Sequence, residues 1–331
     1  MTVKILHPGL LTSIQDLGRF GSQQYGVIVS GAMDPYSLRI ANLLVGNDQG
    51  EGALEITLMG TSMQFQQDQL IAITGGNLQA TINGEHAPLW RPIVVKKGSV
   101  LQFKYAVQGC RAYIAFAGGI DVPEVMGSKS TYMRAGIGGY KGRALQKGDV
   151  FNCGEMGKQS RSLIRELEEL GEHLTWTVNY NALVNLEQMQ TIHVLKGTEF
   201  ARFDRASQQA LFNGSYTLTT NSDRMGSRLE GPVLSLSEKY ELLSEGVTYG
   251  TIQIPPNGQP IILMADRQTT GGYPKIGQVM TADLPSLAQL RPGAKIRFQE
   301  VSLEQAESEY MNKERIIQKI KTGVHLKGMA N

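Results

Sequence analysis

The chain has 331 residues, of which 41% are hydrophobic and 19% are charged, and its net charge at pH 7 is +2. These values are typical of a folded soluble protein long enough for two domains, and so weak and evenly spread a charge argues against nucleic-acid binding. Cys110 and Cys153 are too few for a disulfide framework or a four-cysteine zinc site, and we find neither a signal peptide nor a membrane-spanning run. We therefore expect a cytoplasmic protein that does not bind membranes.

The first fifty residues predict two short strands and then a helix. Residues 3–6 and 10–14 have the apolar character of strands, with turn residues between them. Asp34 followed by Pro35 is a strong helix start, because aspartate caps free amides and proline fits the first helical position. An apolar stripe follows, and Gly46 stands where a glycine commonly ends a helix.

The rest of the chain is predicted to be mainly strands. Residues 53–152 contain one short strand after another, separated by turns, and this spacing favours a barrel or sandwich over alternating β-α-β units. Residues 158–172 are charged with a weak helical stripe and predict a helical linker. Strand-like segments resume at Trp176 and continue to residue 298, and the amphipathic tail from Ser302 predicts a terminal helix.

The two halves of the chain resemble each other. Three segments of the first half have counterparts in the second half, and the three pairs keep the same order. They are residues 30–39 with 222–229, residues 112–123 with 260–274, and residues 145–153 with 290–298. The shared order indicates two similar β domains in tandem, although chance similarity among glycine-rich strands is the alternative.

A polar cluster follows the predicted buried strand at residues 260–264. Residues 266–270 are all polar, Gly271 and Gly272 allow the backbone to turn, and Tyr273 and Lys275 come next. Polar side chains beside glycines at the end of a strand are typical of a functional site. A hairpin loop whose aspartate and threonines cap their own backbone would produce the same pattern.

Familiar catalytic and nucleotide-binding motifs do not fit the sequence. Residues 127–131 resemble the end of a phosphate-binding loop and residues 136–142 a dinucleotide motif, but both have the wrong spacing. The five histidines are scattered without metal-ligand spacing, and there is no serine elbow. An enzymatic function would therefore use carboxylates, arginines, backbone amides and Tyr273, with no metal ligands.

Five blocks of the sequence resemble the allophanate hydrolase subunit 2 family. They are residues 9–21, 26–47, 117–132, 222–232 and 259–293. The family includes one component of bacterial 5-oxoprolinases and part of the carboxyltransferase domain of urea carboxylase. The resemblance implies a mainly β fold of two tandem cyclophilin-like β-barrel domains with a few short helices. We place the domains at residues 1–155 and 191–300, with a linker at 156–190 and a helical tail at 301–331.

The same resemblance implies a function and partners. The chain would belong to an ATP-hydrolysing 5-oxoprolinase that opens 5-oxo-L-proline to L-glutamate. The assembled hetero-oligomer would bind ATP with Mg, and its other members would be a KipI-like protein and a LamB/YcsF-like protein. Phosphorylation of the lactam oxygen would make the ring carbon electrophilic, which explains the use of ATP.

Under this function we assign roles to residues of the polar cluster and of the N-terminal block. Asp266 would transfer protons, Arg267 and Lys275 would bind anions, and Tyr273 would offer a hydrogen bond or a ring face. We expect these residues to share a cleft between the domains with Ser30, Asp34 and Arg39. Capping already explains Asp34, and an ion pair on a helix face would explain Arg39. The predicted catalytic residues are Asp266, Arg267 and Tyr273, and the predicted substrate-binding residues are Ser30, Asp34, Arg39, Gln268, Thr269, Gly271, Gly272 and Lys275.

Two other functions fit the resemblance. The chain could be half of a biotin-dependent carboxyltransferase that acts on urea or a similar small amide, with biotin in place of ATP. It could also be a non-enzymatic antagonist that binds a KipI-type kinase inhibitor, which needs only an interface. The lack of an attached biotin carboxylase or biotin-carrier segment favours the 5-oxoprolinase function over the carboxyltransferase.

Overall fold

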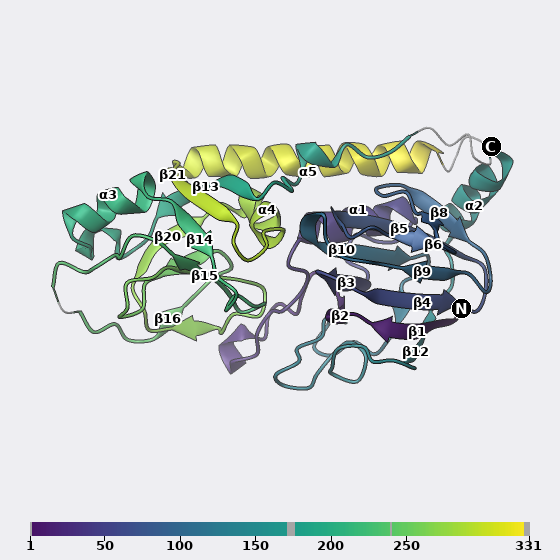
Figure 1. The fold of residues 1–331 in the computed structure, drawn as a ribbon, viewed down its shortest axis with the longest axis horizontal. Helices are drawn as coiled ribbons and strands as arrows, with labels where there is room; N and C mark the ends of the chain where they lie inside the picture. The colour runs from purple at the N-terminus through teal and green to yellow at the C-terminus, as the bar shows by residue number, and fades with distance from the viewer. Residues whose placement is uncertain (1, 171–175, 239, 328–331) are drawn as a thin grey trace.

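The computed structural model describes residues 2–170, 176–238 and 240–327. Two β-rich bodies lie side by side, and one long helix runs along both of them (Figure 1). We call them the sandwich, formed by strands within residues 2–153, and the barrel, formed by strands within residues 189–300. Among the described residues, no helix has the length and apolar character needed to cross a membrane.

The sandwich consists of two antiparallel sheets packed face to face. The seven-stranded sheet has the order β11-β12-β1-β4-β9-β6-β7, and the five-stranded sheet has the order β2-β3-β10-β5-β8. The strands of the first sheet are β1 (Thr2–Pro8), β4 (Thr61–Phe65), β6 (Thr81–Ile82), β7 (Glu85–His86), β9 (Val100–Gln102), β11 (Ile120–Asp121) and β12 (Val150–Cys153). Those of the second are β2 (Leu11–Gln15), β3 (Ala53–Thr57), β5 (Gln69–Asn77), β8 (Pro92–Val95) and β10 (Gln108–Phe116).

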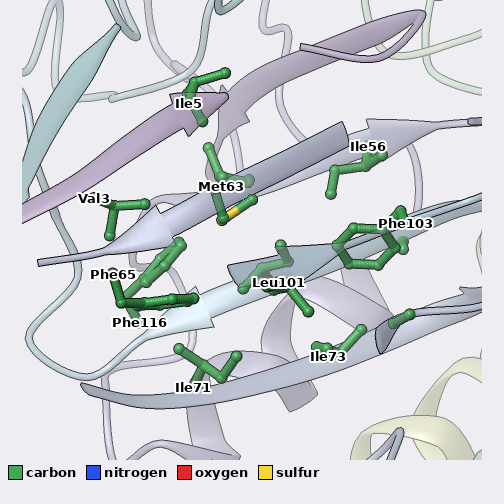
Figure 2. Packing of buried hydrophobic residues seen from close by; sticks show 14 of the residues in the cluster. Val3, Ile5, Ile56, Met63, Phe65, Ile71, Ile73, Leu101, Phe103 and Phe116 are labelled. Carbon is green, nitrogen blue, oxygen red and sulfur yellow. The ribbon is translucent and has the colours of Figure 1, made fainter. Parts of the chain in front are cut away.

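The core of the sandwich lies between its two sheets. Figure 2 shows Val3 and Phe65 of one sheet packed toward Ile71 and Phe116 of the other. The second sheet is also covered on its outer face, because Leu70 and other alternate residues pack against helix α1 (Pro35–Leu44). A strand buried on both faces has no polar side to alternate with, which explains the continuous apolar run of β5.

Helix α1 has the predicted start and end. The side chain of Asp34 accepts a hydrogen bond from the Ser37 amide at 2.9 Å, and Pro35 opens the first turn. Val45 is the C-terminal capping residue, and Gly46 follows with φ +77°, a left-handed conformation that glycine adopts without strain. Both predictions are confirmed.

The barrel is closed, with the strand order β13-β20-β17-β18-β15-β14-β21. Its pairs are antiparallel except β13 with β21, which are parallel. The strands are β13 (Met189–Lys196), β14 (Tyr216–Leu218), β15 (Gly226–Glu230), β17 (Thr251–Gln253), β18 (Ile261–Leu263), β20 (Lys275–Val279) and β21 (Lys295–Glu300). A separate short pair, β16 (Glu245–Gly246) with β19 (Thr270–Gly271), lies beside the barrel.

The mainly β prediction is confirmed, but the structure differs from two closed barrels. Only residues 189–300 of the described chain close into a barrel, whereas residues 2–153 form two sheets. The strand predicted from Trp176 is wrong, because the next strand starts at Met189. The apolar residues before it, including Val178 and Leu183, pack instead into the cluster around α1.

The predicted internal duplication gains only partial support from the topology. In each half the last strand pairs with the first, but β12 is antiparallel to β1 while β21 is parallel to β13. The segment at residues 30–39 leads into helix α1, whereas its counterpart at 222–229 leads into strand β15. The duplication and the exact domain limits therefore remain predictions.

Helices cover the outside of both bodies. They are α2 (Lys158–Leu170), α3 (Arg205–Asn213), α4 (Leu284–Ala288) and α5 (Leu303–Lys327). The predicted linker helix corresponds to α2, and residues 171–175 of the predicted linker lie outside the described residues. Helix α5, the predicted terminal helix, has 25 residues and is about 38 Å long. It packs Ile317 and Val324 against the sandwich and Ala306 against the barrel (Figure 1).

Candidate functional site

A buried ion-pair network joins the sandwich to the barrel. Arg224, in the loop before β15, donates to the carboxylate of Asp266 from Nε and Nη2, each at 3.0 Å, and it also pairs with Glu55 of β3. The exposed fractions of these side chains are 5% for Arg224, 7% for Asp266 and 1% for Glu55. Ser30 donates from Oγ to Asp266 at 2.8 Å, and Arg224 donates to the Gly31 carbonyl at 2.5 Å.

The charges in this network support one another. Burial alone would lower the pKa of Arg224, but the carboxylates of Asp266 and Glu55 outweigh burial and raise it. Glu55 also accepts from the Tyr113 hydroxyl at 2.8 Å and from the Met33 amide at 2.9 Å. Burial raises the pKa of Tyr113 well above its ordinary value, so this hydroxyl stays a donor. The network fixes the loop that follows β18 against the sandwich.

Gln289 makes a second polar link between the two bodies. Its Oε1 accepts from the amides of Cys110 and Arg111 at 3.0 Å, and its Nε2 donates to Asp34 at 2.8 Å. Asp34 is completely buried, and burial raises its pKa to about 6. The N-cap of α1 is thus also a contact of the interface.

A cavity of about 510 Å³ opens at the barrel beside this interface. Its charged or strongly polar lining residues are Arg134, Asp223, Arg228, Gln253, Arg267, Gln268 and Tyr273. Arg134 comes from the sandwich, while the others come from the barrel. A concave surface with a few convergent polar groups is the usual form of a small-molecule site, so we take this cavity as the candidate site.

Arg267 is the half-buried cation of the cavity. It lies one residue after Asp266, and its guanidinium is 5.6 Å from the centre of the Tyr249 ring. Burial lowers the pKa of Arg267. Its Nη1 reaches the Met264 carbonyl only at 3.4 Å, and its Nε is buried without a hydrogen-bond partner. An unpaired buried donor is costly, so the surrounding protein does not fully satisfy this guanidinium.

Tyr273 lies between two cavities. Its side chain is 45% exposed, and with Gly272 it also lines a second cavity of about 920 Å³ formed by residues around 234–242 and 254–256. Gly271 belongs to β19, whose pairing with β16 holds this part of the loop. The Tyr273 ring is therefore available to a ligand from either side.

The structure brings together five of the predicted site residues at the cavity: Arg267, Gln268, Gly271, Gly272 and Tyr273. Ser30 and Asp266 meet as predicted, but in the buried network behind the cavity. Thr269 does not line this cavity, and its carbonyl accepts from the Val247 amide at 3.1 Å.

Four predicted roles need correction. The oxygens of Asp266 accept hydrogen bonds from Arg224 and Ser30, so the carboxylate holds the loop behind the cavity. Asp34 serves as the buried cap described above. Arg39 forms a two-pronged ion pair with Glu314 of α5, at 2.6 and 2.7 Å.

Lys275 is the fourth correction. Its Nζ lies 2.5 Å from Glu245 and 3.7 Å from Glu199, and the residue does not line the cavity. These two carboxylates satisfy the ammonium, which explains why it does not serve as an anion ligand there.

Sequence reasoning missed Arg134 and Arg228. Arg134 lies just before the glycine-rich loop at residues 136–142, and Arg228 lies on a strand that gives no local signal. The motif at residues 127–131 is structural, since Ser128 and the Lys129 amide donate to Asp16 at 2.8 and 2.6 Å. In the described part of the chain, no group of three or more His, Cys, Asp or Glu side chains could hold a metal ion.

Similar proteins extend over almost the whole chain. Residues 25–300 match the family described as carboxyltransferase domain, subdomain A and B. The chain is 40% identical to the C subunit of 5-oxoprolinase from Escherichia coli (strain K12), covering 98% of this chain and 99% of that protein. It is 39% identical to the C subunit of 5-oxoprolinase from Haemophilus influenzae, covering 92% and 93%. The structure of the Kluyveromyces lactis urea amidolyase is similar at 30% identity with a TM-score of 0.86, covering 96% of this chain and 20% of that chain.

Proposed function

This chain belongs to the carboxyltransferase domain family, subdomains A and B, and from that premise we propose that it is the C subunit of an ATP-dependent 5-oxoprolinase. The observation that carries the proposal is the identity of 40% over 98% of this chain and 99% of the E. coli protein. The cavity at Arg267 supports the proposal, because it has the size and the polar groups that a small acidic substrate needs.

The urea-directed alternative has weaker support. Urea amidolyase of K. lactis shares the fold, but at 30% identity and over 20% of its own length. Fold alone does not determine which amide is the substrate. The higher identity to 5-oxoprolinase components therefore favours a cyclic amide over urea, and an enzyme over a non-enzymatic antagonist.

The proposed reaction breaks the amide bond of a five-membered lactam. ATP would supply a phosphoryl group to the lactam oxygen, which makes the ring carbon open to attack by water. The residues of this chain would bind and orient the acid: Arg267 through its positive charge, and Gln268 and Tyr273 through hydrogen bonds. Asp266 would act as a positioning residue that holds Arg267 at the cavity through Arg224.

We propose that ATP binds mainly outside the glycine-rich loops of this chain. Residues 127–131 are committed to Asp16, as described above. Gly138, Gly139 and Gly142 have positive φ and lie so close to neighbouring atoms that a Cβ would clash. These glycines therefore serve the packing of a tight loop and leave no open cradle for phosphates.

Exposed apolar side chains near the cavity support assembly with other proteins. Tyr25 is 78% exposed, Phe20 67% and Met126 54%, and Met133 adjoins the cavity residue Arg134. Arg19 ties these loops together by donating to the carbonyls of residues 125 and 130. Phe20 and Met126 each adjoin one partner of the Arg19–Val125 contact, and exposed apolar groups on neighbouring loops are typical of a protein interface. We propose that the KipI-like and LamB/YcsF-like partners complete the enzyme here.

Reconstitution tests the proposed function. The isolated chain is expected to show little or no 5-oxo-L-proline-dependent ATP hydrolysis, and addition of the KipI-like and LamB/YcsF-like partners is expected to produce it. The measurement is ADP and L-glutamate release by the chain alone, by the two partners together, and by all three proteins. Turnover by the isolated chain would contradict the need for partners, and no turnover by the three together would contradict the function.

Arg267→Ala is expected to lower turnover in the assembled enzyme at least tenfold, about 1.4 kcal/mol of transition-state binding. The reason is that Arg267 is the half-buried guanidinium among the described residues that line the cavity. The free energy of unfolding should fall by no more than about 1 kcal/mol, which is the usual contribution of a cation–π contact such as that of Arg267 with Tyr249. Arg297→Ala, on the exposed outer side of β21, is the matched control and should leave turnover unchanged.

Rate per folded molecule and melting temperature should be measured together for both variants. If Arg267→Ala melts early while its rate per folded molecule stays normal, the loop is scaffold and the site assignment is wrong.

A further inference from the structure

The candidate cavity carries more positive than negative charge. Arg134, Arg228 and Arg267 line it, and Asp223 is the only carboxylate among the described lining residues. The Oδ1 of Asp223 already accepts from the amides of Met225 and Gly226 at 2.8 and 3.1 Å. One carboxylate, held by the amides of its own turn, balances the charge of only one of the three guanidinium groups.

These three arginines differ in their partners from two buried or partly buried cations nearby. Arg224 is paired with Glu55 and Asp266, and Lys275 lies near two glutamates. By contrast, the structure records no ion pair for the side chain of Arg134 or Arg228 within the residues it describes. Arg267 adds a buried Nε without a partner. Arginines that line one cavity outside the recorded ion pairs are suited to an oxyanion, since each guanidinium offers parallel N–H donors.

Arg134 is held in place by a compact loop of the sandwich. The Tyr132 amide donates to the Ile137 carbonyl at 2.9 Å, and the two residues form an isolated β-bridge. Gly142 closes the loop by donating to the Gly138 carbonyl at 2.8 Å. The loop therefore presents Arg134 to a cavity whose other arginines belong to the barrel.

We propose that this cavity is an oxyanion subsite in which Arg134, Arg228 and Arg267 together bind the acidic group of a small organic acid. The inference rests on the proposed function for the identity of the acid, which would be 5-oxo-L-proline or its phosphorylated form. The carboxylate and the phosphoryl group share the chemistry that the three guanidiniums recognise. An uncharged lactam has no negatively charged oxygen group, so we expect it to bind poorly.

The test is binding to the full chain without partners, measured by titration calorimetry at low salt. The probes are 5-oxo-L-proline, inorganic phosphate and the uncharged lactam 2-pyrrolidinone. We expect both anions to bind the unmodified chain, and Arg134→Ala and Arg228→Gln each to weaken that binding about tenfold. Arg297→Gln removes an exposed arginine from the same barrel and should leave binding unchanged.

The anion that binds more tightly and displaces the other identifies the group for which the subsite is built. The proposal is overturned if neither anion binds, if Arg134→Ala and Arg228→Gln bind both as the unmodified chain does, or if 2-pyrrolidinone binds as tightly as 5-oxo-L-proline. Both arginines are exposed and outside the recorded ion pairs, so these variants should fold, which circular dichroism checks.

Failure of the proposed function gives a different result. If the chain binds anions through these arginines but the assembly with its two partners does not open 5-oxo-L-proline, the subsite stands and the substrate is another small acid. If the assembly turns over 5-oxo-L-proline but the two variants bind and react normally, the function stands and the subsite is wrong.

Discussion

Arg224→Met is expected to lower the free energy of unfolding by about 4 kcal/mol, the largest effect of any single substitution considered for this chain. The substitution leaves the carboxylate of Asp266 buried without its cation and leaves Glu55 with only Arg111, at 4.0 Å. A buried charge without a partner is far more costly than the pair is favourable, so the loss exceeds that for a surface ion pair. Chemical unfolding followed by tryptophan fluorescence and circular dichroism measures it.

Neutralising the two carboxylates provides the decisive control. The triple variant Arg224→Met, Glu55→Gln, Asp266→Asn should recover at least half of the loss, because the two carboxylates that lose Arg224 are then uncharged. The recovery stays partial because Arg111 no longer has the Glu55 carboxylate at 4.0 Å. Arg228→Met, four residues away and exposed, should stay within about 0.5 kcal/mol of the unmodified chain. If Arg224→Met does not fold, Arg224→Lys keeps the charge and allows the comparison. A loss below about 1 kcal/mol for Arg224→Met would show that the network does not hold the two bodies together.

Asp34→Asn is expected to gain stability relative to the unmodified chain as the pH rises. Burial raises the pKa of Asp34 from 3.8 to about 6, so between these values the folded chain holds a proton that the unfolded chain has lost. Stability from this group is therefore complete below the unfolded pKa and is lost as the pH rises through the folded pKa. The difference between the two proteins should change by about 3 kcal/mol between about pH 3 and about pH 8.

Asp204→Asn is the matched control, because Asp204 caps helix α3 in the same way but near the surface. Its side chain accepts from the Ser207 amide at 2.7 Å, and this hydrogen bond lowers the pKa of Asp204. A lowered pKa gives stability above the unfolded value that is lost on acidification, so the Asn substitution should show the opposite pH trend. Unfolding of both variants over a pH series is the measurement. If the stability difference changes with pH in the same direction for both variants, burial does not raise the pKa of Asp34.

The parts of the fold that depend on neighbouring residues could be predicted from the sequence. Helix α1 follows from Asp34, Pro35 and Gly46, whose effects act within one helical turn. The polar cluster after β18 was also visible, because a strand that ends in arginine, glutamine and two glycines is unusual. Five residues of that cluster line the cavity, as described above.

The ion pairs of the candidate site could not be predicted, because they join residues that are far apart in the sequence. Arg224 meets Asp266 across 42 residues and Glu55 across 169. Lys275 looked free in the sequence, but glutamates 30 and 76 residues away satisfy it. Whether a cation is available to a ligand depends on which carboxylates the fold places beside it, and this information is absent from a single strand or loop.

Helix α5 bears on how the candidate cavity would bind. It is fixed to the sandwich through the ion pair of Glu314 with Arg39, and to the barrel through Ala306 beside Met280. A hinge motion between sandwich and barrel would have to break these contacts or the buried network. Many enzymes fix the relative position of two lobes only when these close on a substrate. In this chain the contacts of α5 and the buried network already fix it before a ligand binds. With its arginines at a fixed spacing, the cavity should discriminate acids by their size more sharply than a cleft that adapts to its ligand.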